Sequence, residues 1–433
     1  MTDTILGNIT GIASEGQGII RYEGLVIFIP FAVTGDIVRY RIVKQKKNFA
    51  VGELVEIVEP SPLRIAPQCP YFGICGGCQL QHLSYDAQLS FKRQWVEDAL
   101  RKIGGLANIV VPPVIPSQQQ WGYRRRINLT LRPNGKFFES GYVGADKQSI
   151  VNISQCPIFV PSSDPIIATL QKNIGMLLCA GPEEGKVTIL KKNDTQYIVH
   201  FNFKKMPENM QEVSLKLMQE CTSIIGILAT SARKTLQFGS LDNSLKIDNL
   251  KFDFSPRAFI QNHPEQSVNI YQAIESVVKE YSPRQILDLY CGIGISSCLL
   301  AKQGFSVTGV EANSEAIRLA ERNGKQNKLA SARFVVATVE AFLEKKKESN
   351  DPVEDLTIMN PPREGLSPVV TQALLDRRSK VIIYVSCMPS TLARDLKQLC
   401  AGGYTVEKVQ SYDMFPQTVH VETVATLQFQ AKS

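Results

Sequence analysis

Beyond residue 264 the sequence alternates between strand-like and helix-like segments, and this rhythm limits the possible folds more than any other feature. Short aliphatic and β-branched runs occur at QILDLY, SVTGVE, ARFVVAT, LTIMN and KVIIYVS, with amphipathic helical patterns between them. Two more strand-like segments, YTVEKVQSYDMF and VHVETVATLQF, follow near the C-terminus. Alternation of this kind produces a mostly parallel sheet with helices on both faces. We therefore predict a doubly wound α/β domain over residues 256–433.

The preceding part of the chain has a different pattern, and 433 residues exceed one ordinary hydrophobic core. Residues 1–58 alternate short β-rich runs with turns, which fits a five-stranded barrel of the OB type or an SH3-like barrel. A proline-rich segment, EPSPLRIAP (59–67), leads out of it. We assign residues 59–255 to a central, β-rich domain, so that the chain is predicted to be a multi-domain α/β protein.

Within the central region the sequence predicts one helix and two hairpins. The helix begins after Ser84 and ends before two consecutive glycines at 104 and 105. Its apolar residues recur at four-residue spacing: Phe91, Trp95, Ala99 and Ile103. The hairpins have turns at Asn134-Gly135 and at Asn193-Asp194, residue types that favour tight turns.

Composition indicates a soluble, cytoplasmic protein. Hydrophobic residues make up 44% and charged residues 21% of the chain, and the first residues lack the basic and apolar regions of a signal peptide. The longest apolar stretch, LVIFIPFAV (25–33), is far too short to span a membrane. In the reducing cytoplasm, clustered cysteines hold a metal more often than they form disulfides. We expect no membrane association and no obligate protein partner.

The charge pattern predicts a nucleic-acid partner. The net charge is +7, and basic residues concentrate in RYRIVKQKKN (39–48) and WGYRRRINLTLR (121–132). In the second segment Arg124, Arg125 and Arg126 are interleaved with aromatic rings. Basic groups neutralise phosphates while flat rings stack on bases. Either segment alone could also be a solvated face.

Three cysteines lie within ten positions in the segment CPYFGICGGCQLQH (69–82). Cys69, Cys75 and Cys78 are close enough in sequence to share one metal centre, and four ligands are the usual number. On chemistry alone, thiolates suit either structural zinc, with His82 as a possible substitute ligand, or an iron–sulfur cluster.

A cofactor site is predicted in the C-terminal domain. In DLYCGIGISS (288–297), Gly292 and Gly294 follow a strand and open a helix, where the backbone can approach a ligand closely. The next strand ends at Glu311, whose carboxylate can accept both hydroxyls of a ribose. Position 297 is serine, so the third glycine of the dinucleotide fingerprint is missing. This favours S-adenosylmethionine over NAD.

Four polar or reactive side chains fall at predicted carboxyl ends of strands: Tyr290, Glu311, Asn360 and Cys387. Ligands of open α/β sheets bind outside these ends. Each residue alone could be structural, for example Cys387 as a small buried hydrophobe. Their convergence on one edge indicates an active site.

These residues suit methylation of uracil at C5. A thiolate that adds to C6 turns C5 into a nucleophile for the methyl group, and a base must then remove the C5 proton. Cys387 is the only cysteine at a predicted strand end beside a proline-containing turn. Glu422, in HVET (420–423), is the candidate base, and His420 could serve instead or orient it.

The sequence resembles the RNA 5-methyluridine methyltransferase family over essentially its whole length. The matching motifs include Gln261 in FIQNH, DLYCGIG, an x-P-P-R loop at 360–363, Ser-Cys-x-Pro and His-Val-Glu. The resemblance implies a TRAM barrel, a central iron–sulfur domain and a Rossmann-like methyltransferase domain. It also implies Cys387 as nucleophile and Glu422 as base. The donor-binding residues that it implies are Gln261, Tyr290, Gly292, Glu311 and Asn360.

The same resemblance implies a [4Fe-4S] cluster held by Cys69, Cys75, Cys78 and the distant Cys156 in SQCP. The cluster is expected to be structural and to shape the RNA-binding surface. Relatives with both barrel and cluster mostly act on large-subunit (23S) ribosomal RNA, so we rank this substrate above transfer RNA.

The motifs depart from the family pattern at several positions. Asn360 replaces a common Asp, Met388 and His263 replace common Asn residues, and Ile295 stands where relatives often have Asn. Three alternative functions remain. Two are enzymatic: an amino-methyltransferase, since Asn-Pro-Pro resembles an amine-binding motif, and a 5-methylcytosine enzyme. The third is a non-catalytic RNA-binding or iron–sulfur sensing module.

Overall fold

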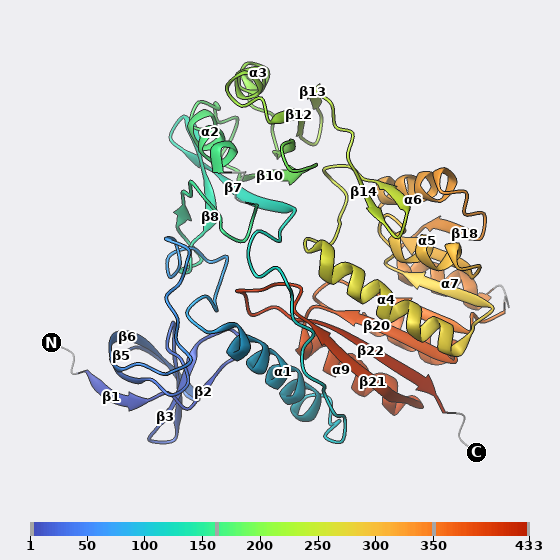
Figure 1. The fold of residues 1–433 in the computed structure, drawn as a ribbon, viewed down its shortest axis with the longest axis horizontal. Coiled ribbons are helices and arrows are strands. Elements are labelled where there is room, and N and C mark those ends of the chain that lie inside the picture. Colours follow the sequence, from blue (N-terminus) through green and yellow to red (C-terminus); the bar gives the residue numbers. More distant parts are fainter. Residues whose placement is uncertain (1–3, 161–163, 349–351, 431–433) are drawn as a thin grey trace.

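The computed structural model describes residues 4–160, 164–348 and 352–430, which form three larger sheets and one small hairpin sheet (Figure 1). None of the helices in these ranges is long and apolar enough to cross a membrane. The N-terminal sheet, the central sheet and the C-terminal sheet follow each other along the chain.

The N-terminal sheet closes on itself as a barrel. Its strands are β1 (Ile5–Asn8), β2 (Gly11–Ile12), β3 (Gly18–Tyr22), β4 (Leu25–Ile29), β5 (Ile37–Gln45) and β6 (Phe49–Glu59). The sheet order is β1-β5-β6-β4-β3-β2. Because β1 and β2 stand at opposite ends of this order but are neighbours in the chain, the first and last strands meet. The sheet thus has six strands instead of the predicted five, since the first one is broken at Ile9–Thr10.

Helix α1 (Tyr85–Lys102) connects the barrel to the C-terminal domain. It begins after Ser84 and is followed by Gly105, which has a left-handed backbone (φ 68°), as predicted. The indole of Trp95 donates a hydrogen bond to the carbonyl of Ile12 in the barrel, at 3.1 Å. Further along, Val96 and Leu100 are buried in the core of the C-terminal domain.

The central sheet is mixed and carries two helices. Its elements are β7 (Arg126–Asn134), β8 (Phe137–Val143), β9 (Ile150–Val151), α2 (Asp164–Ile174), β10 (Gly185–Lys191), β11 (Tyr197–Asn202), α3 (Met210–Glu220), β12 (Ile224–Thr230) and β13 (Thr235–Gly239). The order is β13-β12-β11-β10-β7-β8-β9. Both predicted hairpins, β7–β8 and β10–β11, are confirmed. The two helices were not predicted, and α3 is the connection that makes β11 and β12 parallel.

A short hairpin precedes the C-terminal domain. Its strands are β14 (Ser244–Ile247) and β15 (Leu250–Asp253), and it turns at Asp248 and Asn249, both with positive φ. The hairpin contacts α6 of the C-terminal domain, where the Asp253 amide donates to the Asn323 side chain at 2.8 Å.

The C-terminal domain is the predicted doubly wound α/β fold. Its elements are α4 (Pro264–Tyr281), β16 (Gln285–Leu289), α5 (Ile295–Lys302), β17 (Ser306–Glu311), α6 (Ser314–Gln326), β18 (Ala332–Val336), α7 (Val339–Glu348), β19 (Leu356–Met359), α8 (Pro368–Arg377), β20 (Val381–Ser386), α9 (Pro389–Ala401), β21 (Tyr404–Tyr412) and β22 (Glu422–Phe429). The strand order is β18-β17-β16-β19-β20-β22-β21. The first five strands are parallel, and β22 is antiparallel to both of its neighbours.

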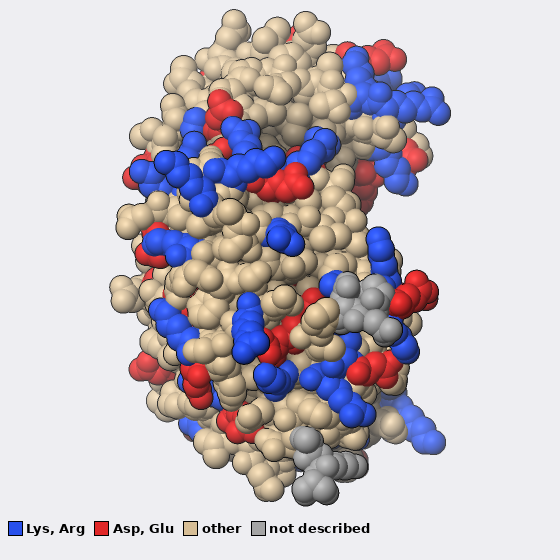
Figure 2. Space-filling model, turned by 90° about the vertical axis from the view of Figure 1, so that its right-hand side faces the viewer, with Lys and Arg blue, Asp and Glu red and all other residues tan. Residues whose placement is uncertain are grey.

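Two hydrophobic layers enclose this sheet. Helix α4 and part of α5 pack on one face, against alternate residues such as Ile286 and Ile358. Helices α7, α8 and α9 pack on the other face together with α1, against residues such as Leu287 and Met359. Along the side of α6 and β18, the surface intersperses basic with acidic side chains (Figure 2).

Candidate active site

Four of the predicted site residues lie along one edge of the C-terminal sheet. Strands β17, β16, β19 and β20 are neighbours in this order and run parallel. Glu311 ends β17, while Tyr290, Asn360 and Cys387 directly follow the other three strands. The amide of Asn360 donates to the carbonyl of Leu289 at 3.4 Å, so Tyr290 and Asn360 leave the sheet side by side.

The sheet register brings Cys387 and Glu422 together. Ser386, the last residue of β20, pairs with Thr423 of the antiparallel strand β22. One further step along this register places Cys387 opposite Glu422, the first residue of β22. Directly opposed residues in antiparallel strands have Cα atoms about 4.5–5.5 Å apart. Two residues far apart in sequence thus become neighbours at the sheet edge.

Burial raises the pKa of both groups. Glu422 is only 3% exposed, and burial raises the pKa of its carboxyl to about 8, although the nearby Arg363 opposes the shift. Burial also raises the pKa of the Cys387 thiol, and the charge of Glu422 raises it further. Arg363 lowers it again by hydrogen bonding and by its charge. Arg363 is therefore the cation that favours the ionised form of either group.

Arg363 was not predicted as a site residue, although it ends the NPPR motif. It follows β19 on the loop to α8, and its guanidinium lies 3.3 Å from Nε2 of His420. The His420 ring also contacts the Phe415 ring edge-on, with centroids 5.8 Å apart. The sequence signal was available: Arg363 is a charged residue only four positions after the end of strand β19.

His420 is the weaker of the two candidate bases. Burial and the neighbouring Arg363 lower the pKa of its imidazole to about 4. Burial raises the pKa of Glu422 to about 8, so its carboxylate is the stronger proton acceptor of the two. His420 is therefore a neutral neighbour of Arg363.

The glycine loop after β16 is open at Gly292. A Cβ added to Gly292 would meet no atom within 4 Å, whereas one on Gly294 would lie 2.7 Å from the Phe334 ring. Both glycines have positive φ, 56° and 77°. Gly294 is therefore required for packing, while the backbone at Gly292 faces space into which a ligand can fit.

The first turn of α5 is held from the strand before it. The buried Asp288 carboxylate accepts hydrogen bonds from the hydroxyls of Ser296 and Ser297, each at 2.6 Å. Ser297, which replaces the third glycine of a dinucleotide fingerprint, therefore has a structural partner. At the next strand end, Oε1 of Glu311 accepts the amide of Asn313 at 2.8 Å.

The departures from the family pattern mostly have structural explanations. His263 caps α4, lies 2.7 Å from the Ser117 hydroxyl and stacks on Tyr123 with ring centroids 4.7 Å apart. Ile295 is buried in a cluster with Ile260, the residue that precedes Gln261. Gln261 therefore lies near the start of α5. Met388 caps α9, and its amide donates to the Ser386 hydroxyl at 3.2 Å.

The structure brings the four predicted metal-binding cysteines to one cavity. Cys69, Cys75, Cys78 and Cys156 all line it, together with Arg124. Burial raises the pKa of Cys75 to about 11 and that of Cys78 to about 12. Within the described ranges, no three or more His, Cys, Asp or Glu side chains form a group arranged to hold a metal ion. The four cysteines therefore share a cavity, but their side chains in the described ranges are not arranged as metal ligands.

His82 does not line this cavity. Its ring lies against Phe72, with centroids 5.3 Å apart, and near Phe31. The alternative of His82 as a substitute ligand therefore has no support in the structure.

The predicted phosphate contact at Arg124–Arg126 stays a prediction, and two of the three side chains have surroundings within the protein. Arg124 lies in the wall of the cysteine cavity. The Arg126 guanidinium donates to the carbonyls of Pro256 and Ala258, at 3.2 and 2.9 Å. In the barrel, Arg39 pairs with Glu56 at 3.2 Å, and the exposed lysines at 44, 46 and 47 lie around the turn between β5 and β6.

Two family models match the chain. The model described as tRNA (Uracil-5-)-methyltransferase matches residues 84–430. The TRAM domain of tRNA (uracil(54)-C(5))-methyltransferase matches residues 5–63. Among individual proteins, an uncharacterized RNA methyltransferase of Protochlamydia amoebophila is 47% identical over 423 residues, which covers 97% of this chain and 96% of the relative. Another from a Nostoc species is 33% identical, covering 97% and 95%.

A solved structure is similar over the full length. The Pyrococcus abyssi tRNA (uracil-54, C5)-methyltransferase, in complex with S-adenosyl-L-homocysteine, is 29% identical and superposes with a TM-score of 0.74. The match covers 98% of this chain and 100% of the Pyrococcus protein. Barrel, central sheet and C-terminal domain therefore recur together in a protein of known structure.

Proposed function

Because the chain belongs to the tRNA (uracil-5-)-methyltransferase family, we propose that Cys387 and Glu422 are the nucleophile and the base with which it methylates uridine at C5. The protein is an S-adenosylmethionine-dependent RNA methyltransferase. The observation that carries the assignment is the register of β20 and β22, which sets Cys387 opposite Glu422 at the carboxyl edge of the sheet.

The first step belongs to Cys387. Its thiolate adds to C6 of uracil, and the electron pair of the C5–C6 double bond moves toward O4 to form an enolate. Arg363 supports this step because its guanidinium favours the thiolate over the thiol. S-adenosylmethionine, when bound, supplies an electrophilic methyl group. C5 of the enolate would bond to that methyl carbon while the bond from the methyl carbon to the donor sulfur breaks, so that S-adenosyl-L-homocysteine leaves.

The second step belongs to Glu422. Its carboxylate takes the proton from C5, the C–H electron pair re-forms the C5–C6 double bond, and the bond from Sγ to C6 breaks. Cys387 leaves as a thiolate, and Glu422 ends the cycle protonated. A carboxyl with a pKa of about 8 can accept this proton and still lose it to water near neutral pH.

We assign donor binding to Gln261, Tyr290, Gly292, Glu311 and Asn360. Support comes from the positions of Tyr290, Gly292, Glu311 and Asn360 at one sheet edge and from the open space at Gly292. Gln261 lies near the start of α5. Glu311 would accept the ribose hydroxyls with the oxygen that Asn313 leaves free. Asn360 would hydrogen-bond with its amide where relatives use a carboxylate.

We propose large-subunit ribosomal RNA as the first candidate substrate, on the combination of barrel and cysteine site. Transfer RNA is the second, and a specific observation favours it: the similar Pyrococcus enzyme is a tRNA (uracil-54, C5)-methyltransferase. The two are separated by offering the protein 23S rRNA fragments and tRNA transcripts in parallel. Mapping of the modified uridine then decides between them.

We further propose that Cys69, Cys75, Cys78 and Cys156 would hold a [4Fe-4S] cluster. Four thiols on one cavity fit the donor set. Burial raises the pKa values of Cys75, Cys78 and Cys156, so these three ionise only beside compensating positive charge. The same thiols also suit zinc. The cluster's role would be structural, since the reaction at Cys387 needs no electron. Iron, sulfide and zinc analysis of anaerobically purified protein separates these possibilities.

The reaction is tested by release of tritium from RNA labelled at uracil C5. Wild type and Cys387→Ala are incubated with RNA and S-adenosylmethionine side by side. Donor-dependent release by wild type, lost in the variant, supports C5 methylation through a covalent adduct. Methyl incorporation without tritium release, retained by Cys387→Ala, would replace this mechanism with methylation of an exocyclic amine.

A further inference from the structure

The loop between β21 and β22 leads directly into the catalytic pair. It runs from Asp413 to Val421, contains His420 and ends where Glu422 begins β22. It forms no helix or strand, yet most of its residues are buried. Since Glu422 is the first residue after the loop, the path of the loop helps to set where its carboxylate points.

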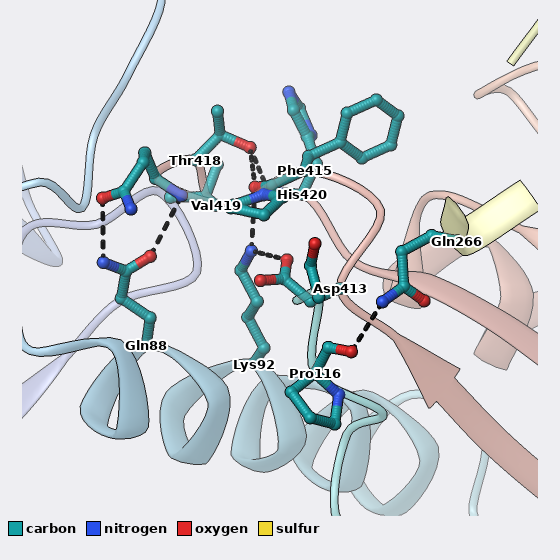
Figure 3. A network of polar contacts seen from close by, with 12 residues as sticks. Gln88, Lys92, Pro116, Gln266, Asp413, Phe415, Thr418, Val419 and His420 are labelled. Carbon is teal, nitrogen blue, oxygen red and sulfur yellow. Dashed lines mark hydrogen bonds and ion pairs between the residues drawn. The ribbon is translucent and has the colours of Figure 1, made fainter. Parts of the chain in front are cut away.

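Helix α1 holds the start of this loop. The ammonium group of Lys92 donates to Oδ1 of Asp413 at 2.6 Å and to the carbonyl of Phe415 at 3.0 Å (Figure 3). The side chains of both Lys92 and Asp413 are fully buried. Tyr85 of the same helix donates its hydroxyl to Oδ2 of Asp413 at 2.8 Å. This ion pair joins a helix outside the predicted 256–433 domain to the loop inside it.

Helix α1 also holds the middle of the loop, through Gln88. Its side-chain nitrogen donates to Oε1 of Gln417, and its oxygen accepts the Gln417 amide, both at 3.0 Å. Gln417 has a left-handed backbone, with φ of 71°. A non-glycine residue adopts this conformation at a cost and keeps it only when its surroundings fix it. The two hydrogen bonds with Gln88 hold Gln417 in this backbone conformation.

The segment after Cys78 supports the same residue. The amides of Gln79 and Leu80 both donate to the Gln417 carbonyl, at 3.2 and 3.0 Å. The Gln79 side chain accepts the amide of Val419 at 3.4 Å. The loop is therefore fixed from outside the sheet, and the strained residue lies three positions before His420.

We propose that Gln88 and Lys92 are positioning residues for the proton-removal step: they fix the 413–421 loop so that Glu422 reaches C5 of the methylated adduct. Neither residue touches the reacting atoms in this account. The inference rests on the proposed function, because it names which step of that reaction the loop serves. It assigns to α1 a role beyond joining the barrel to the C-terminal domain.

A defect in the proton-removal step has a specific consequence for the reaction. With the loop loosened, Cys387 can still add to C6 and C5 can still take the methyl group, since Cys387 lies on the other strand. Loss of the C5 proton becomes slow, so the Sγ–C6 bond persists. A positioning defect therefore accumulates a methylated covalent RNA–protein adduct. A general loss of folding would instead lower adduct and product together.

The lead variant is Gln88→Leu, because it removes the hydrogen bonds and creates no buried charge. Lys92→Met is the second variant. Arg93→Met is the matched control: Arg93 lies on the same helix, but it binds the carbonyl of Val111 and Glu97 instead of the loop. Each protein is incubated with RNA and methyl-labelled S-adenosylmethionine, and denaturing gels separate adduct from free methylated RNA. Amide hydrogen exchange of residues 413–420 is measured without RNA.

We expect Gln88→Leu to lower kcat on the order of 10- to 100-fold, the effect of a small misplacement of a reacting group. KM for RNA should change far less, labelled adduct should increase, and exchange of the loop amides should accelerate. Arg93→Met should match wild type in adduct and in loop exchange. Equal adduct levels in Gln88→Leu and Arg93→Met, or unchanged loop exchange in Gln88→Leu, would overturn the inference. Absence of 5-methyluridine from the wild-type reaction would instead overturn the proposed function.

Discussion

Replacement of Glu422 by glutamine should abolish turnover and at the same time stabilise the protein, increasingly so as the pH rises. Burial raises the pKa of this carboxyl from 4.5, the value of a free glutamate, to about 8 in the folded protein. An acid whose pKa is raised by folding destabilises the fold once the pH exceeds its unfolded pKa. The penalty begins near pH 4.5, grows as pH rises, and becomes constant above about pH 8.

The magnitude follows from the same two values. A tenfold difference in proton binding corresponds to about 1.4 kcal/mol, so the ionised carboxylate costs the folded state on the order of 5 kcal/mol above pH 8. Glutamine has nearly the same shape and no charge, so Glu422→Gln escapes this penalty. Below pH 4.5 both proteins carry a neutral side chain at this position, and their stabilities should be similar.

The assay is thermal denaturation of wild type and Glu422→Gln at several pH values between 4 and 9. The unfolding transition of the C-terminal domain is the one that is followed. The gap between the two midpoints should widen from pH 5 to pH 8 and then stop widening. A gap that is constant over this range would refute the claim that burial raises the pKa of Glu422. A gap that shrinks as the pH rises would show that folding lowers the pKa of Glu422 instead of raising it.

Three further predictions follow from the site. Arg363→Met should slow alkylation of Cys387 by iodoacetamide at neutral pH and lower turnover, because the thiolate loses its guanidinium; equal alkylation rates would contradict this role. Gly292→Ala should weaken donor binding, measured by calorimetry with S-adenosyl-L-homocysteine, while leaving the melting temperature nearer to wild type than Gly294→Ala does. Gly294→Ala should instead destabilise the fold through contact with the Phe334 ring; the reverse ranking would contradict the assignment. Cys78→Ser should remove bound metal and lower the melting temperature, and unchanged iron and zinc contents would count against a metal site.

The doubly wound domain could be predicted in detail because its signals are local. Each of its seven strands is a short apolar run bounded by a helical pattern or a turn, and all seven were recognised. The predicted position of the active site follows from a topological rule, since parallel strands place their carboxyl ends at one edge. What the sequence could not give was the pairing of β22 with β20, because strand order depends on long-range packing.

The central region was harder because its helices carry a mixed signal. In α2, Ile166, Ile167, Leu170 and Ile174 follow helical spacing, yet isoleucine is also typical of strands. Tertiary packing against the sheet settles such segments, and a single sequence does not contain it. The six-stranded barrel was read as five-stranded for a related reason, since the break at Ile9–Thr10 divides one continuous β-rich run.

The charged residues show why side-chain roles are the least predictable. The run at Arg124–Arg126 predicts an RNA contact, but it lies where the chain enters β7, and two of its side chains have surroundings within the protein. Arg124 turns to the cysteine cavity, and Arg126 turns to the carbonyls of 256 and 258. Lys92 was not singled out by the sequence, yet it is fully buried against Asp413, more than three hundred positions away. Such partners are visible only in three dimensions.

The most direct test of the central claim uses Glu422→Gln to trap the adduct. The variant is incubated with substrate RNA and S-adenosylmethionine, digested with protease and nuclease, and examined by mass spectrometry. We expect a peptide that carries a 5-methylated uridine on Cys387, since addition and methyl transfer proceed while proton removal does not. Methylated RNA without any nucleotide attached to Cys387 would contradict that claim.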